Sequence, residues 1–135
     1  MPIPWLDSLT VGVPAFDGEH REMLDLLNRA RAHADLDETE QARATMEAYI
    51  ALLIAHCDRE EQIMRDTGYH RAEDHARSHK AAIETARQVP AILAEPKRKD
   101  EVDPLILDMQ NHLIRRILLD DGALAVYLDH IGMRA

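Results

Sequence analysis

The sequence is poor in the residues and runs that mark several protein classes. It has one cysteine, which excludes an internal disulfide and any zinc site built from several cysteines. Five glycines and six prolines in 135 residues exclude collagen-like and low-complexity chains. The longest apolar runs are only a few residues, far short of the roughly 20 needed to span a membrane. The first ten residues, MPIPWLDSLT, lack the basic and apolar regions of a secretory signal, so we expect a cytoplasmic protein.

Positive charge is also scarce. Lysine and arginine total 16 against 25 aspartates and glutamates, which gives a formal net charge of -9. Such an acidic chain repels phosphate backbones and anionic lipids, so we expect neither nucleic acid nor a membrane as partner. Apolar residues make up 46% of the chain, which is enough for one hydrophobic core. We therefore expect a single domain over residues 1–135, and we favour a monomer.

Apolar side chains recur at the spacing of α-helices, whereas the alternation typical of strands is scarce. The pattern predicts long helices over residues 17–35, 38–67, 71–89 and 104–121, followed by a short helix over 123–130. The segment around Trp5 has no helical pattern. The predicted fold is all-α: an up-down-up-down antiparallel four-helix bundle with an N-terminal extended arm and a short C-terminal helix.

Several residues predict where these helices begin and end. Asp37 and Glu40 have the spacing of a capping box for the second helix. Pro90 should bend or end the third helix, and residues 95–101 should form a charged loop. Asp103 followed by proline should cap the fourth helix, and Gly122 should break it.

Histidine and glutamate interrupt the apolar faces of the first three predicted helices. His20 lies on the first, His56 and Glu60 lie four apart on the second, and His75 and His79 lie four apart on the third. Residues four apart lie one turn above each other, so each pair can hold one ion. A buried carboxylate is costly unless it is paired or coordinated, and a bundle core is a usual place for a metal site. All five residues on inward faces predict a shared site for iron, zinc or manganese.

Each of these residues also has a simpler interpretation. His20 alone could be a hydrogen-bonded core histidine, and either pair alone could be an exposed surface pair. The metal site is favoured because the five positions coincide on three successive helices. We interpret His33, His70 and His130 as solvated, because they lie at predicted helix ends or in loops. Cys57 is expected to be a small core thiol, and Glu61 is expected to face the flank.

Three segments together resemble the bacterial hemerythrins. They are WLDSLTVGVPAFDGEH from Trp5 to His20, HCDREEQIM from His56 to Met64, and GYHRAEDHARSH from Gly68 to His79. The resemblance extends over nearly the whole chain. Myohemerythrin is a standard example of the up-down four-helix bundle, so the resemblance agrees with the predicted fold.

The resemblance implies a non-haem di-iron centre, oxo- and carboxylate-bridged, that binds O2 reversibly. By position, His20 and His56 would hold the iron with an open coordination site, and His75 and His79 would hold the second iron. Glu60 would bridge the two. Another divalent metal stays open as an alternative to iron.

The fourth predicted helix departs from the family pattern, which is roughly WLxxHIxxxDxxLxxYL. This chain has HLIRRILLDDGALAVYL from His112 to Leu128. Matching the family aspartate to Asp121 recovers most of the pattern, makes Asp121 the second bridge and puts Arg116 at the position of a histidine ligand. Arginine has no free lone pair and cannot ligate a metal. His112 is the alternative ligand, but we favour a buried or half-buried His112 without metal.

Three functions are compatible with these residues. We favour an O2-binding protein for storage, transport or sensing over an enzyme, with O2 or a small anion as its ligand. The alternative is a di-metal oxidoreductase acting on peroxide, O2 or nitric oxide, in which Arg116 holds an anionic ligand. A metal-sensing module is the third possibility, and a metal-free bundle is the remaining alternative.

Overall fold

The computed structural model describes residues 2–133, and every regular element in that range is helical. The predicted all-α class is therefore confirmed. The long helices are α1 (Pro14–Asp35), α2 (Thr39–Thr67), α3 (Ala72–Leu93) and α4 (Val102–Arg116), and α4 continues through a π-helical segment, η3 (Ile117–Asp121), into α5 (Gly122–His130). Short 3-10 turns, η1 (Asp7–Leu9) and η2 (Pro96–Glu101), precede α1 and α4. None of the described helices is both long enough and apolar enough to cross a membrane.

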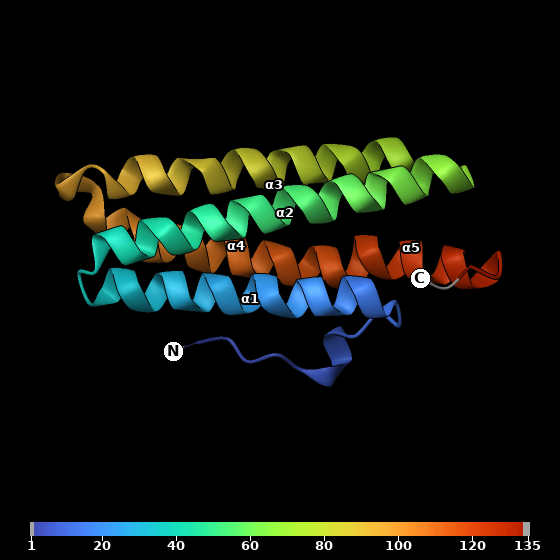
Figure 1. The fold of residues 1–135 in the computed structure, drawn as a ribbon, viewed down its shortest axis with the longest axis horizontal. Coiled ribbons are helices and arrows are strands. Elements are labelled where there is room, and N and C mark those ends of the chain that lie inside the picture. The colour runs from blue at the N-terminus through green and yellow to red at the C-terminus, as the bar shows by residue number, and fades with distance from the viewer. Residues whose placement is uncertain (1, 134–135) are drawn as a thin grey trace.

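The four long helices lie side by side and form a bundle (Figure 1). Helix α1 packs against α2 and α4, and α3 packs against the same two neighbours. The apolar stripes of all four meet at the centre, where the largest fully buried side chains include Leu27, Met46, Tyr49, Leu53, Ile106 and Leu113. A smaller apolar cluster near α5 contains Phe16, Met64, Leu124 and Leu128. The bundle thus has two apolar regions, and what lies between them is described below.

The segment before α1 runs alongside that helix (Figure 1). The Asn28 side chain accepts a 2.9 Å hydrogen bond from the Ile3 amide and donates a 2.7 Å bond to the Ile3 carbonyl. The Arg21 guanidinium lies 5.6 Å from the centre of the Trp5 ring, within range of a cation–π contact. These contacts attach the segment to α1 at two points.

A polar network connects α1 to α4 beneath this segment. Arg31 donates hydrogen bonds to Asp103 at 2.9 Å and to the Gln110 side-chain carbonyl at 3.0 Å. Gln110 is fully buried and donates a 2.7 Å bond to Asn28. Because the Gln110 side chain both accepts and donates a hydrogen bond in this network, burial of its amide does not carry the cost of an unpaired polar group.

Several predicted helix boundaries are wrong. Helix α1 begins at Pro14, and Asp17 instead accepts a 2.8 Å hydrogen bond from the Val11 amide. The capping box does not form: Asp37 has a positive φ of 59°, and α2 begins at Thr39 without a side-chain cap. Helix α4 begins at Val102, one residue before the expected cap Asp103. Asp37 lies in a turn and Asp103 is bonded to Arg31, so neither side chain caps a helix, and differences of one residue at a helix end are usual.

The two expected helix breakers act more weakly than predicted. Pro90 lies within α3, which continues to Leu93, since a proline in the last turn removes only one helical hydrogen bond. Gly122 has helical φ and ψ of -61° and -43°, so the prediction that it breaks the fourth helix is wrong. The irregular turn of this helix lies just before Gly122, in η3. The expected charged loop over 95–101 is largely the 3-10 turn η2.

Gly68 and Gly18 give a matched pair of substitutions with opposite signs. Gly68 ends α2 with φ of +66°, and Gly18 is helical; a Cβ at either position would meet no atom within 4 Å. Gly68→Ala should lower the free energy of unfolding by about 1 kcal/mol, because alanine is strained in the left-handed region. Gly18→Ala should raise it by about 0.5 to 1 kcal/mol through helix propensity. Urea unfolding of both variants checks this, and equal effects would contradict the assigned backbone conformations.

Candidate metal centre

A layer of buried polar side chains separates the two apolar regions of the bundle. Phe16 and Leu24 belong to different apolar clusters, and His20 lies between them on α1. On the other helices, too, polar side chains lie between the two apolar regions, so side chains that could hold a metal meet at one level of the bundle from α1, α2, α3 and η3. The six members of the layer are each no more than 5% exposed: His20, His56, Glu60, His75, His79 and Asp121.

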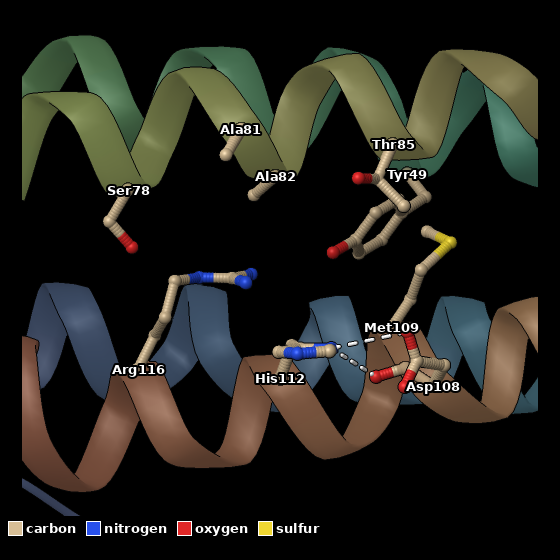
Figure 2. Close-up of a pocket in the computed structure, with 9 residues that line it drawn as sticks. All are labelled: Tyr49, Ser78, Ala81, Ala82, Thr85, Asp108, Met109, His112 and Arg116. Atoms are coloured by element: carbon tan, nitrogen blue, oxygen red, sulfur yellow. Dashed lines mark hydrogen bonds and ion pairs between the residues drawn. The ribbon is translucent and has the colours of Figure 1, made fainter.

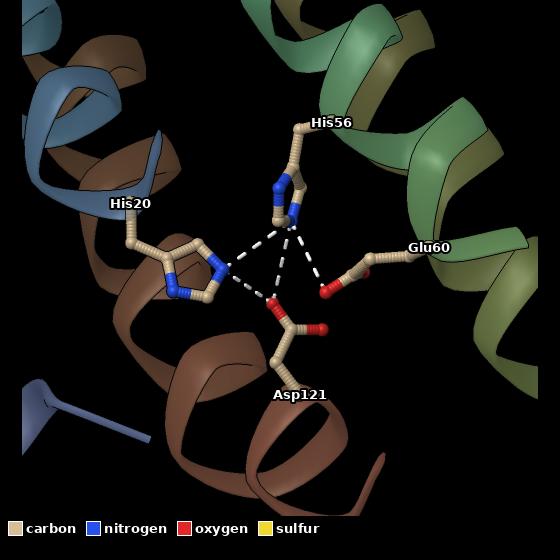
Figure 3. A group of neighbouring side chains, drawn as sticks. All are labelled: His20, His56, Glu60 and Asp121. Atoms are coloured by element: carbon tan, nitrogen blue, oxygen red, sulfur yellow. Dashed lines mark hydrogen bonds and ion pairs between the residues drawn. The ribbon is translucent and has the colours of Figure 1, made fainter. Parts of the chain in front are cut away.

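One half of this group contains two imidazoles and one oxygen from each of two carboxylates (Figure 3). His20 Nε2 lies 2.7 Å from Asp121 Oδ2 and 3.3 Å from His56 Nε2. His56 Nε2 lies 3.3 Å from Glu60 Oε2 and 3.6 Å from Asp121 Oδ2. Four ligand atoms therefore face a common point.

The other half uses the remaining oxygens of the same two carboxylates. His75 Nε2 lies 3.0 Å from Glu60 Oε1 and 2.8 Å from Asp121 Oδ1, and His79 Nε2 lies 2.9 Å from Glu60 Oε1. In each half, all the ligand atoms lie within 4.8 Å of one another. Glu60 and Asp121 are thus shared, with one oxygen directed to each pair of imidazoles.

The donor set fits a pair of metal ions. Glu60 Oε2 is buried and accepts no hydrogen bond, although His56 Nε2 lies 3.3 Å away, and the Nε2 atoms of His20 and His56 lie 3.3 Å from each other. When the imidazoles are neutral, such an arrangement leaves nitrogen lone pairs directed at the centre. Histidine and carboxylate together suit iron, zinc or manganese.

Outer hydrogen bonds orient two of the imidazoles. Glu19 accepts a 3.0 Å bond from His56 Nδ1, and Glu61 accepts a 3.0 Å bond from His79 Nδ1. A carboxylate on Nδ1 fixes the ring so that Nε2 faces inward, the usual arrangement behind metal-bound histidine. The flank position predicted for Glu61 agrees with this role. Glu19 was not predicted, and its place directly before His20 gave no periodicity signal.

The charges of the group are strongly coupled. Burial lowers the pKa of His56, but hydrogen bonds to the Asp121 and Glu60 carboxylates outweigh it and raise the pKa to about 10. The same balance raises the pKa of His75 to about 9. Burial raises the pKa of Glu60 and Asp121, but hydrogen bonds from the histidines hold both well below their usual range. Without metal, protonated imidazoles therefore compensate two buried carboxylates.

The π-helical segment η3 brings Asp121 into the group. An α-helix turns by about 100° per residue, so two residues five positions apart, such as Arg116 and Asp121, would lie about 140° apart around its axis. The wider π turn reduces that angle, and Asp121 is consequently buried although it follows the exposed Leu118 and Leu119. π-Helical turns occur frequently at functional sites.

The two other candidates on this helix lie outside the group. The His112 side chain is 61% exposed, and its Nδ1 donates a 2.9 Å hydrogen bond to the Asp108 carbonyl. The expectation of a buried or half-buried His112 is wrong, and the structure does not bring this residue to the centre. Arg116 is half-buried and lines a cavity between α3 and α4.

The remaining histidines and Cys57 lie largely as predicted. His70 and His130 are exposed, whereas His33 is half-buried and its Nδ1 lies 3.0 Å from Glu38. Cys57 is buried in the larger apolar cluster. None of the four belongs to the group described above.

Comparison with known proteins gives two findings. The family model of the hemerythrin HHE cation binding domain matches residues 11–128. A bacteriohemerythrin of Stenotrophomonas maltophilia (strain R551-3) is 26% identical over 125 residues, which cover 90% of this chain and 78% of that protein. The resemblance predicted from the three motifs is confirmed, and the matched range contains all six residues of the buried group.

Metal uptake at pH 7 should release the protons of His56 and His75. Their raised pKa values, about 10 and 9, keep both imidazoles protonated at pH 7, and a metal needs their free lone pairs. Metal affinity should accordingly rise as the pH increases from 7 to 9. Calorimetric titration in two buffers of different ionisation enthalpy measures the released protons. A titration that releases none would show that both rings are neutral before metal binds.

Proposed function

The chain belongs to the hemerythrin HHE cation-binding domain family, and from this premise we propose that it is a non-haem di-iron protein that binds O2. The proposed centre is carboxylate-bridged and lies inside a single up-down-up-down bundle, with O2 storage, transport or sensing as its role. One observation carries the proposal: Glu60 and Asp121 each direct one oxygen to His20 and His56 and the other toward the second pair of histidines.

Four imidazoles and two carboxylates would hold the metals, two imidazoles on each. Iron is favoured over zinc and manganese by the family resemblance, since the donor atoms suit all three. Iron would supply the site at which O2 binds and the electrons that reduce it. Glu19 and Glu61 would keep His56 and His79 in the orientation that the metals need.

Apolar side chains around the centre would exclude water. The Phe16 ring lies edge-on to His56, with 5.8 Å between ring centres, and Met64 and Leu124 are fully buried in the same cluster. A dry, low-dielectric surrounding limits proton access and loss of the reduced metal to side reactions. These residues therefore protect a reversible O2 site.

Metal content per chain tests the proposal. Protein expressed with iron should contain about two irons, one for each ligand set, and its visible spectrum should change reversibly between oxygen and argon. Asp121→Asn should lose most of the iron, because it removes a carboxylate shared by both sets. Asp120→Asn is the matched control, since Asp120 is adjacent but outside both sets. Iron-free wild type, or iron retained equally in Asp121→Asn, would contradict the proposal.

A di-metal oxidoreductase is the second candidate function, and the ligand count supports it. Each half of the group has only two imidazoles, so both metals would keep positions for water, peroxide or nitric oxide. Arg116 stands where the family has a further histidine, five residues before Asp121. Its cation would favour an anionic ligand beside the centre.

Peroxide turnover by the iron-loaded protein, with an external reductant, tests this candidate. Arg116→His should lower the turnover by about 10²-fold, the usual cost of removing one charge-stabilising donor. Turnover equal to or greater than that of the wild type would exclude the oxidoreductase role for Arg116. The metal-sensing interpretation stays a prediction.

A further inference from the structure

A cavity of about 230 Å³ lies between α3 and α4, beside the buried polar layer. Tyr49 from α2, Ser78 and Thr85 from α3, and Arg116 from α4 line it with polar groups. In Figure 2 the Arg116 side chain extends into the space between the two helices, with its guanidinium on the side of Tyr49. Donors from three helices thus face one cavity, which opens to solvent at the exposed Asp108 and His112.

Arg116 is half-buried and has no acidic partner. Within residues 2–133, no carboxylate oxygen lies within 4 Å of its guanidinium. The other half-buried arginines of this range have one: Arg31 pairs with Asp103 at 2.9 Å, and Arg43 lies 4.0 Å from Glu40. A guanidinium stays protonated under all ordinary conditions, so a partly desolvated one favours a negative counter-charge. In this cavity the protein does not supply it.

Neutral donors complete the lining. Tyr49 is 1% exposed, and its hydroxyl points into the cavity (Figure 2). Burial raises the pKa of Tyr49 to about 12 against the opposing effect of Arg116, so the phenol keeps its proton. The hydroxyl groups of Ser78 and Thr85 are also available from α3. An anion in contact with the guanidinium would therefore meet hydroxyl donors as well.

One carboxylate lies on the same cavity, but at its rim. Asp108 is 61% exposed and lies 3.4 Å from His112 Nδ1, and eight residues, about 12 Å of helix, separate it from Arg116. Its charge faces water and is screened there. The anionic ligand is accordingly expected at the Arg116 end.

That end adjoins the buried polar group. Ser78 directly precedes His79, and Arg116 directly precedes the π-helical segment that carries Asp121. Tyr49 lies seven residues, two helical turns, before His56 on the inward face of α2. An anion bound at Arg116 would therefore lie on the His75 and His79 side of the centre.

We propose that this cavity binds a small carboxylate or similar two-oxygen anion, held by the planar fork of Arg116 with Tyr49 as a second donor. A guanidinium matches two adjacent oxygens with parallel hydrogen bonds, which a single-atom anion cannot use. A cavity of about 230 Å³ has room for such a small anion. This binding site is separate from the metal ligands and does not require them.

Calorimetric titration of the metal-loaded protein with formate, acetate and nitrite, at constant ionic strength in chloride, tests the inference. Wild type should bind at one site in addition to any open metal position. Arg116→Met should weaken the affinity at least about tenfold, the effect of removing a charged hydrogen-bond partner. Arg115→Met is the matched control, because it removes the same charge from an exposed neighbour, and it should bind as the wild type does.

Wild type that binds none of the three anions, or Arg116→Met that binds them as tightly as the wild type, overturns the inference. Equal weakening in Arg115→Met also overturns it, since the effect would then be general electrostatics. Circular dichroism and metal content are measured on every variant. Low metal in the wild type would count against the di-iron proposal, whereas intact metal without anion binding would count only against this one.

Discussion

Two carboxylates are buried at the centre of this bundle, and the surrounding structure compensates their charge. Glu60 and Asp121 are each at most 4% exposed, and taking an ionised carboxylate out of water is costly unless it is paired. Four imidazoles surround them within hydrogen-bonding or ion-pair distance. Every helix of the bundle has to present its polar residue at the same level for this compensation to work. The polar layer therefore restricts how far any helix can slide along its neighbours.

The departure from regular helix geometry follows from the same restriction. The fourth helix has to place leucine and isoleucine in the core on one side of the layer and Asp121 within it. The π-helical turn of Ile117–Asp121 shifts the angular position of the residues that follow it, so that the helix meets both requirements. It also leaves Leu118 and Leu119 exposed, at 50% and 60%. The irregular turn that buries Asp121 thus leaves two leucine side chains exposed on the outer side of the helix.

Much of this arrangement could be predicted from residue spacing, and the reason is local. His56 with Glu60, and His75 with His79, face inward because residues four apart share a helical face. The side of the helix on which Asp121 lies could not be predicted from spacing in the same way, because a π turn depends on packing against three other helices. The helical Gly122 follows from that turn, whereas the exposed His112 precedes it and lies beside the regular buried stripe of Met109 and Leu113 on α4. The predicted capping box does not form for a similar reason. Asp37 takes a left-handed conformation between α1 and α2, and the residue types of Asp37 and Glu40 alone do not specify that conformation. Glu19 has no pattern that separates it from other surface glutamates.

The ligands of the centre are distributed very unevenly along the chain. Within any one helix the sequence offers at most a pair of them, four residues apart, whereas His20 and Asp121 are separated by about a hundred positions. An unfolded or half-folded chain can therefore hold a metal only through such a local pair, and weakly. His20 and Asp121 come together only when the first and last helices have packed against each other, which is the contact with the largest loop-closure entropy. Tight metal binding by the whole group would therefore require the completed bundle, so that metal would stabilise the fully packed fold and not its parts.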